Sequence, residues 1–291
     1  MTPVERRSLD RRIEQIYALK TGEGLPDDAA DVVEELLDLL ERGSVRAAAR
    51  SPEGKWSAVP WVKRGILLAF RVGVVVPSAG TEGGAPAGER AAFFDKHTLP
   101  LRRFALSDGI RIVPGGSAVR RGAYLAPKVV CMPPMYVNVG AHVGSGTMID
   151  SHALVGSCAQ VGERVHVSAA AQIGGVLEPV NASPVIIEDD VVIGGNAGVY
   201  EGTIVRKRAV LGAGVILTRG TPVFDLVRER VHRANGDAPL EIPEGAVVVP
   251  GARGVTSAWG ASQALSLQTP VIVKYRDEKT DSATALEDWL R

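Results

Sequence analysis

Apolar residues recur every six positions through the middle of the chain. The series is unbroken over eleven members: Val113, Val119, Leu125, Cys131, Val137, Val143, Ile149, Val155, Val161, Val167 and Ile173. A period of six matches neither the 3.6-residue repeat of a helix nor the simple alternation of a strand. It is typical of short strands separated by turns and repeated at a fixed spacing.

A second set of positions follows the same period, four residues after the apolar one. It holds only small or β-branched side chains: Ala141, Thr147, Ala153, Ala159, Val165 and Ala171. Gly, Ser or Asp commonly follows the apolar residue, and Gly eases turns that need a positive φ. The period slips by two residues across 177–184 and then resumes at Ile187, which predicts a loop that leaves the repeat and returns.

This pattern predicts a mainly β fold, a left-handed parallel β-helix of hexapeptide repeats. Three six-residue units make one triangular coil of roughly 18 residues, and coils stack by parallel pairing. The interior is narrow and accepts Thr, Ala or Val but no large ring, which agrees with the aromatic content of 5%. About six coils fit between residues 113 and 223.

The residues before the repeat predict a helical domain. Segment 28–44 has apolar residues at helical spacing, with Asp27 or Asp28 as the N-cap and Gly43 at its end. The segment from residue 61 predicts a helix followed by a strand, and 77–90 predicts an exposed loop rich in Gly, Pro and Ser.

The residues after the repeat predict a cap for the open end of the prism. Segments 242–254 and 269–278 predict strands, and 282–291 predicts a short amphipathic end. We therefore expect a helical N-terminal domain at 1–108, a β-helix catalytic domain at 109–235 and a small β-rich C-terminal cap at 236–291.

Composition excludes several classes of protein. The 33 basic and 33 acidic residues give a net charge of +0, so no global field draws the chain to nucleic acid or to an anionic membrane. The first 15 residues lack the apolar core of a signal peptide, and apolar segment 65–70 is too short to span a bilayer. The chain has only two Cys, which predicts reduced thiols in the cytoplasm.

Segment 135–205 contains the strings GTMID, VGSCAQVG and GGVLEP and resembles the tetrahydrodipicolinate N-succinyltransferase family. WVKRGILLAFR from residue 61, FDKH at 94–97 and GIRIVP from residue 109 also look like that family, so the likeness covers nearly the whole chain. The resemblance implies transfer of an acyl group from succinyl-CoA to tetrahydrodipicolinate in lysine and diaminopimelate biosynthesis. It also implies a homotrimer with sites between subunits and no metal requirement.

The resemblance places two residues in the substrate site. Asp150, within GTMID, matches a family carboxylate that binds substrate, and a carboxylate in a dry groove can take the proton of an attacking amine. Arg111 matches a substrate-binding arginine, and a guanidinium can grip a carboxylate with two hydrogen bonds. Ser168 matches a small polar position that hydrogen-bonds substrate. Read without the family, Asp150 is a turn residue and Arg111 a solvated cation.

The chain departs from the family at two positions. Gly198 stands where many relatives carry a Glu, which leaves Glu201 as the nearest acid and as a candidate catalytic residue beside Asp150. His152 stands where many relatives carry Trp, and His suits a base role near neutral pH. Glu201 as a plain turn residue and His152 as a pocket-lining residue are the alternatives.

Coenzyme A needs cations for its phosphates and a slot for its pantetheine arm. The cation candidates are Arg206, Lys207, Arg219 and Lys274, by charge alone. Gly195, Ala213 and Gly214 are positions where the backbone can approach the arm closely. A solvated basic surface is the alternative reading.

Three other functions remain open at this point. An N-acetyltransferase using acetyl-CoA has a similar prism, and a silent trimeric scaffold has the same fold. A zinc site of the gamma carbonic anhydrase kind could use His142 and His166 across a trimer, but the His pair five residues apart is absent.

Cys131 is expected in the core, and Cys158 has no activating neighbour, so no acyl-cysteine intermediate is expected.

Overall fold

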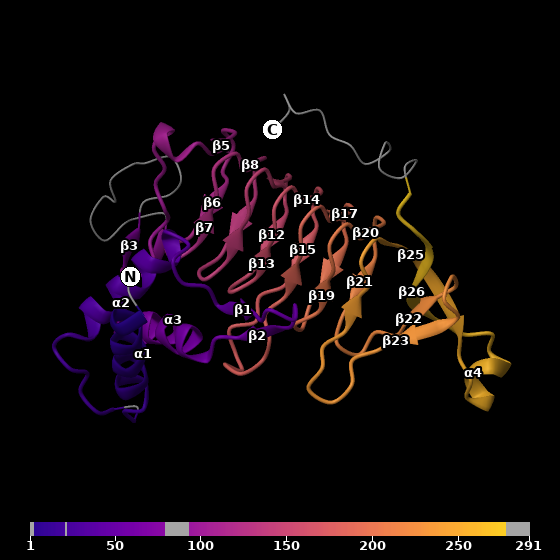
Figure 1. Cartoon of the computed structure of the whole chain (residues 1–291), viewed down its shortest axis with the longest axis horizontal. Helices are drawn as coiled ribbons and strands as arrows, with labels where there is room; N and C mark the ends of the chain where they lie inside the picture. The colour runs from indigo at the N-terminus through magenta and orange to yellow at the C-terminus, as the bar shows by residue number, and fades with distance from the viewer. Residues whose placement is uncertain (1–2, 21, 79–92, 278–291) are drawn as a thin grey trace.

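The computed structural model describes residues 3–20, 22–78 and 93–277, with side chains from residue 8 onward in those ranges. At its centre the chain winds into a triangular prism of short parallel strands, with helices at one end and a β-rich extension at the other (Figure 1). The predicted left-handed parallel β-helix is confirmed.

Three sheets form the sides of the prism, and we name them faces 1, 2 and 3 in the order in which the chain visits them. Face 1 contains β5 (Arg111–Ile112), β8 (Val130–Cys131), β11 (Met148–Ile149), β14 (His166–Val167), β17 (Val192–Ile193) and β20 (Val210–Leu211). Face 2 contains β6 (Ala118–Val119), β9 (Tyr136–Val137), β12 (Leu154–Val155), β15 (Gln172–Ile173), β18 (Gly198–Val199) and β21 (Ile216–Leu217). Face 3 contains β7 (Tyr124–Leu125), β10 (His142–Val143), β13 (Gln160–Val161), β16 (Ile186–Ile187), β19 (Ile204–Val205) and β24 (Glu241–Ile242).

The register of the ladders fixes the coil length. Met148 pairs with Val130 on one side and with His166 on the other, in parallel, so equivalent residues lie eighteen positions apart. Each residue of a coil therefore lies directly above its counterpart in the coil before it. Side chains far apart in the sequence become neighbours along an edge of the prism.

The interior contains both sets of positions identified in the sequence. The second residue of each strand points inward, and Val137, Val143 and Ile149 are 0% exposed. The small residues fill the corners, and Thr147 satisfies its buried hydroxyl by donating to Gly162 O at 2.8 Å and accepting from Val165 N at 3.0 Å. A buried polar group is tolerated when it is paired in this way.

The first member of the predicted series is wrong. The ladder pairs Ile112 with Cys131, so Val113 is not the interior residue of the first coil. The reason is a turn that is one residue longer, in which Gly115 and Gly116 have φ of 139° and 90°. Gly115 must be glycine also because a Cβ there would lie 2.7 Å from Pro133 Cβ.

The glycines that directly follow an interior residue have a different role from the expected one. The left-handed φ falls two positions later, at non-glycine residues including His152, Arg164, Asp190 and Arg208. Gly156 is required for coil spacing, because a Cβ there would lie 2.2 Å from Gly175 N in the next coil. Close stacking of the coils, rather than turn conformation, explains this glycine.

The predicted excursion is confirmed between β15 and β16. It joins the prism to the helical domain, because Leu177 packs against the helical core and Ala182 O accepts a hydrogen bond from Lys63 Nζ at 2.5 Å. Lys63 is 0% exposed, and its burial lowers the pKa of its ammonium group. The Ala182 carbonyl thus accepts a hydrogen bond from the buried ammonium group of Lys63 where the helices meet the prism.

The N-terminal part contains helices α1 (Pro3–Tyr17), α2 (Ala29–Glu41) and α3 (Pro60–Val72) around one apolar core. Asp28 occupies the predicted N-cap position of α2, but its side chain makes no capping bond and instead accepts from Arg12 Nε at 2.8 Å. Gly65 lets α3 approach α2, because a Cβ there would lie 2.2 Å from Leu36 Cδ2.

Two hairpins extend from these helices. Strands β1 (Ala48–Arg50) and β2 (Trp56–Ala58) reach face 3, where Trp56 Nε1 donates to Glu188 Oε1 at 2.9 Å. Strands β3 (Val75–Ser78) and β4 (Phe93–Lys96) follow, and a 3₁₀ turn, η1 (Leu106–Asp108), precedes the prism. The rest of the predicted 77–90 loop, from residue 79, lies outside the described residues.

The C-terminal part continues two of the three faces. β24 extends face 3, and β25 (Ala246–Gly254) pairs with β20 on face 1. β26 (Ser266–Tyr275), β22 (Val223–Asp225) and β23 (Arg230–His232) widen face 1, while α4 (Ala258–Ser262) lies in the β25–β26 connection. The predicted amphipathic end at 282–291 lies outside the described residues, and the domain boundaries at 108 and 235 stay predictions.

In the part of the chain that the structure describes, no helix combines the length and apolar character needed to cross a membrane.

The narrow interior leads to a stability prediction. Ala153 is 2% exposed at a corner between coils, so Ala153→Leu must displace neighbouring coils and lower the free energy of unfolding by about 1–3 kcal/mol. Urea denaturation followed by circular dichroism measures the change. Leu at exposed Ala213 is the control, and equal stability of the Ala153 variant and the wild type would contradict a filled interior.

Candidate active site

The turns between strands form three edges of the prism, named here by the faces they join. Edge 1–2 includes residues 150–153, edge 2–3 includes 156–159 and edge 3–1 includes 144–147. Asp150 and Ser168 lie on edge 1–2 at the same position of consecutive coils, and Asp150 N donates to Val167 O at 2.9 Å. The structure therefore brings these two predicted residues together.

A carboxylate–imidazole pair lies at this edge. His166 Nε2 is 3.8 Å from Asp150 Oδ2, and the two side chains are 21% and 30% exposed. Asp150 Oδ1 accepts from Ser151 N at 2.7 Å, which orients the carboxylate. A half-exposed carboxylate beside an imidazole can hold an amino group and take its proton.

Sequence reasoning did not assign His166 to this pair. From the sequence, His166 was named only as a possible zinc ligand together with His142. The signal was present, because His166 is eighteen residues after Met148 and therefore pairs with it, next to Asp150. Applying the coil length to polar residues as well as to apolar ones would have found it.

Arg111 and His152 lie near this edge. Arg111 is on β5 of face 1, two strands from β11, which corresponds to roughly 10 Å between the strands. It is exposed. His152 is exposed in the turn after Asp150, with a φ of 62°, and its N–H donates to Pro134 O at 2.5 Å. His152 therefore adjoins Asp150, whereas Arg111 lies on the same face two strands away.

Glu201 lies on a different edge. It is in a turn of edge 2–3, and its Oε2 accepts from Arg219 N at 2.9 Å. Gly198 is buried in β18 beneath the ring of Tyr200, and a Cβ at residue 198 would lie 2.4 Å from Tyr200 Cε2. Within one chain Glu201 is not placed beside Asp150, and Tyr200 occupies the space a longer side chain at 198 would need.

The predicted pantetheine positions continue the edge that carries Asp150. Gly195 is in the coil after Ser168, and Ala213 and Gly214 are in the next one. Gly214 N donates to Gly195 O at 3.0 Å, which shows that these turns stack. Edge 1–2 thus runs from polar residues in the early coils to small residues in the late ones.

The predicted phosphate-binding cations do not share this edge. Arg206 and Lys207 lie on edge 3–1, where Arg206 is ion-paired with Glu188 at 3.0 Å and with Glu241 at 2.8 Å. Lys207 Nζ is 3.3 Å from Glu244 Oε1. These ion pairs bind the last coils together.

The other two cations lie apart from each other as well. Arg219, on edge 2–3, donates to Gly236 O. Lys274, on β26, is 3.3 Å from Asp277 Oδ1. Within a single chain the four cations do not converge on one phosphate site.

The described residues contain no cluster of three or more His, Cys, Asp or Glu able to hold a metal ion. His142 is on β10 of face 3 and His166 on β14 of face 1, so the two histidines lie on different sides of the prism.

Both cysteines are buried and free. Cys131 is in the prism interior, as predicted, and Cys158 is in the core shared with the helical domain. Burial raises the pKa of each thiol to about 12. Neither is a nucleophile at neutral pH, because only the thiolate reacts.

Comparison with known proteins adds the family. The model of the tetrahydrodipicolinate N-succinyltransferase N-terminal domain matches residues 8–72, and that of the hexapeptide repeat of succinyl-transferase matches 184–219. The 2,3,4,5-tetrahydropyridine-2,6-dicarboxylate N-succinyltransferase of Rhodopseudomonas palustris is 42% identical over 91% of this chain and 90% of its own. The chain belongs to the tetrahydrodipicolinate N-succinyltransferase family. The enzyme of that name from Parvibaculum lavamentivorans is 40% identical over 100% of this chain and 98% of its own.

A solved structure from Campylobacter jejuni, a putative 2,3,4,5-tetrahydropyridine-2-carboxylate N-succinyltransferase, is 16% identical with a TM-score of 0.45. It covers 83% of this chain and 62% of its own length.

Burial of the thiols leads to a prediction about reactivity. A colorimetric thiol reagent at pH 8 should detect no free thiol in the native protein and both in denaturant, because each pKa is about 12 and neither group reaches solvent. Rapid modification of Cys158 in the folded protein would show instead that the helices separate from the prism often enough to expose this thiol to solvent.

Proposed function

We propose that the chain transfers the succinyl group of succinyl-CoA to the amino nitrogen of ring-opened tetrahydrodipicolinate. The products are N-succinyl-2-amino-6-oxopimelate and free CoA. The observation that carries this proposal is the pairing of Asp150 with His166 on the edge that also bears Ser168 and the small residues of the later coils. The names of relatives that match almost the full chain support it.

The chemistry requires a neutral amine. Its nitrogen lone pair attacks the thioester carbonyl, a C–N bond forms, and the C–S bond breaks to release CoA thiolate. The attack leaves a positive charge on the nitrogen, and Asp150, whose carboxylate lies 3.8 Å from His166 Nε2, accepts the proton that the nitrogen loses. The same proton then passes to the thiolate sulfur of CoA, so atoms and charges balance.

Substrate recognition follows from the two ends of the acceptor. The acceptor has two carboxylates, and Arg111 on face 1 can grip one with two hydrogen bonds. Ser168 can hydrogen-bond the acceptor next to the reacting nitrogen. The pantetheine arm lies along Gly195, Ala213 and Gly214, where the backbone leaves room for it.

We also propose that the enzyme is a homotrimer in the cytoplasm. The cation candidates for the CoA phosphates lie on separate parts of the prism: Arg206, Lys207, Arg219 and Lys274. This supports a trimer, because neighbouring prisms can bring different edges to one CoA molecule. Sedimentation equilibrium should find a single trimeric species, and a monomer that is fully active would contradict shared sites.

The decisive experiment measures CoA release with tetrahydrodipicolinate as acceptor. Succinyl-CoA should be the preferred donor, and Asp150→Asn should lower kcat by about 10²–10⁴-fold because the amine loses its proton acceptor. Asp190→Asn, which removes a carboxylate from edge 3–1, should retain activity.

Other results would reassign the function. A preference for acetyl-CoA would indicate an N-acetyltransferase, which the glycine at residue 198 leaves open. A loss in Glu201→Gln as large as in Asp150→Asn would return the base role to Glu201. No turnover with either donor in a folded trimer would leave the scaffold function.

A further inference from the structure

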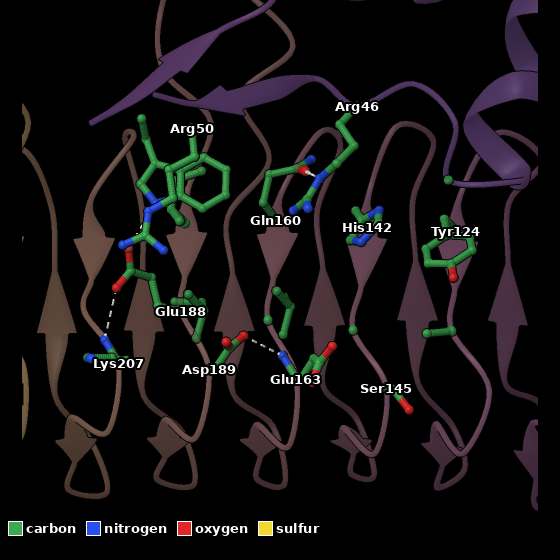
Figure 2. A pocket seen from close by; sticks show the side chains of 18 of the residues that line it. Arg46, Arg50, Tyr124, His142, Ser145, Gln160, Glu163, Glu188, Asp189 and Lys207 are labelled. Atoms are coloured by element: carbon green, nitrogen blue, oxygen red, sulfur yellow. Dashed lines mark hydrogen bonds and ion pairs between the residues drawn. The ribbon is translucent and has the colours of Figure 1, made fainter. Parts of the chain in front are cut away.

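A cavity of about 520 Å³ lies on face 3, away from edge 1–2 (Figure 2). Its floor is made by outward side chains of consecutive coils, including Tyr124, His142 and Gln160. The segment around β1 and β2 covers it with Arg46 and Trp56. The proposed acyl transfer uses none of these residues.

Arg46 extends into this cavity over the outer surface of the prism (Figure 2). Its Nε donates to Gln160 Oε1 at 2.8 Å, and its guanidinium lies 5.6 Å from the centre of the Trp56 ring. Burial lowers the pKa of this guanidinium, and the charge of Asp189 partly offsets that effect. The hydrogen bond to Gln160 and the contact with the Trp56 ring both join Arg46 to uncharged groups.

The other cations that line the cavity are compensated. Arg50 is 3.4 Å from Glu188, and Lys207 is 3.3 Å from Glu244. For Arg46, no carboxylate of the described residues lies within 4.0 Å. A half-buried guanidinium held only by an amide and an aromatic ring has hydrogen-bond donors left for an anionic group.

His142 provides a second unsatisfied group beside Arg46. Its Nδ1 is buried and has no hydrogen-bond partner within the described part of the chain. Its ring stacks on Tyr124 with centroids 4.6 Å apart. Burial and the positive charge of Arg46 lower the pKa of His142 to about 3, so the ring is neutral at pH 7. Buried polar atoms of this kind are usually paired.

Across the cavity, edge 3–1 presents a carboxylate. Asp189 Oδ1 accepts from Glu163 N at 2.8 Å, and Figure 2 shows Asp189 on the side of the cavity opposite the hairpin. Within the described ranges, no Lys, Arg or His nitrogen lies within 4.0 Å of this carboxylate. The neighbouring Asp190, in contrast, is paired with Arg164 at 2.7 Å.

Arg46 and Asp189 thus line one cavity and influence each other through their charges, but they form no direct ion pair. We propose that the cavity binds a free α-amino acid, whose carboxylate lies on Arg46 and whose ammonium group lies on Asp189. A zwitterion satisfies both charges at once, whereas a simple anion or a simple amine satisfies only one. The stacked Tyr124 and His142 rings and the Trp56 ring supply apolar surface for its side chain.

Binding also has a structural consequence. Arg46 belongs to the segment leading from α2 into β1, whereas Asp189 belongs to the prism. A ligand that bridges the two therefore ties the helical domain to face 3. The bound protein should resist thermal unfolding better than the free protein, by mass action.

Isothermal titration calorimetry of the full chain tests the site directly. The probes are L-lysine, L-glutamate and L-leucine, with propionate as the carboxylate alone and butylamine as the amine alone. At least one amino acid should bind with a Kd below about 1 mM, and the two fragments should bind at least about tenfold more weakly. Binding should persist in Asp150→Asn, which separates this site from the proposed active site.

Variants assign the two contacts. Arg46→Gln and Asp189→Asn should each weaken binding by at least about tenfold, while Arg42→Gln, which removes an exposed charge from the same segment, should leave it unchanged. If Arg46→Gln does not fold, the exposed Asp189 still permits the test. Propionate binding as tight as amino acid binding and unaffected by Asp189→Asn would overturn the zwitterion in favour of an anion site. No binding of any probe, or binding abolished by Asp150→Asn, would overturn the site altogether.

Discussion

The structure depends on the fixed length of its coil. Parallel pairing of Met148 with Val130 and with His166 sets eighteen residues for each turn of the chain. The interior then accepts only residues that fit a narrow triangular column, and the buried Thr147 is tolerated because both of its hydrogen bonds are made inside that column. Because every coil repeats the same positions, side chains chosen for chemistry line up along edges rather than inside a central pocket.

Two of the three edges differ in the residues that they present. Edge 1–2 gathers the polar residues Asp150 and Ser168 and then the small residues Gly195 and Gly214, and the proposed substrates would lie along its outer surface. Edge 3–1 is dominated by ion pairs, such as Arg206 with Glu241, that connect successive coils. Burying ion pairs costs desolvation, and these pairs remain partly exposed, so their contribution to stability is modest.

The fold was largely predictable from the sequence, because a six-residue period has one structural explanation. The period located the interior residues and the excursion at 177–184, and it failed only at Val113, where a turn one residue longer shifts β5. The polar partners were less predictable. His166 could have been placed beside Asp150 from the coil length, but the ion pairs that occupy Arg206 depend on Glu188 and Glu241 from other coils. The position of the β1–β2 hairpin over face 3 has no periodic signal, so the cavity there could not be foreseen.

The hydrogen bonds that join the helical domain to the prism connect residues much further apart in the sequence than the eighteen residues that separate paired positions within the prism. Glu41 Oε1 accepts from Gly122 N in the first coils, whereas Trp56 Nε1 reaches Glu188, which lies 132 residues further along the chain. A ribosome therefore releases the helices long before it has made their last docking partner. The prism can lengthen one coil at a time behind them, each coil using the one just formed as a template. The helices are thus synthesised before the prism and are among the last parts to reach their final position.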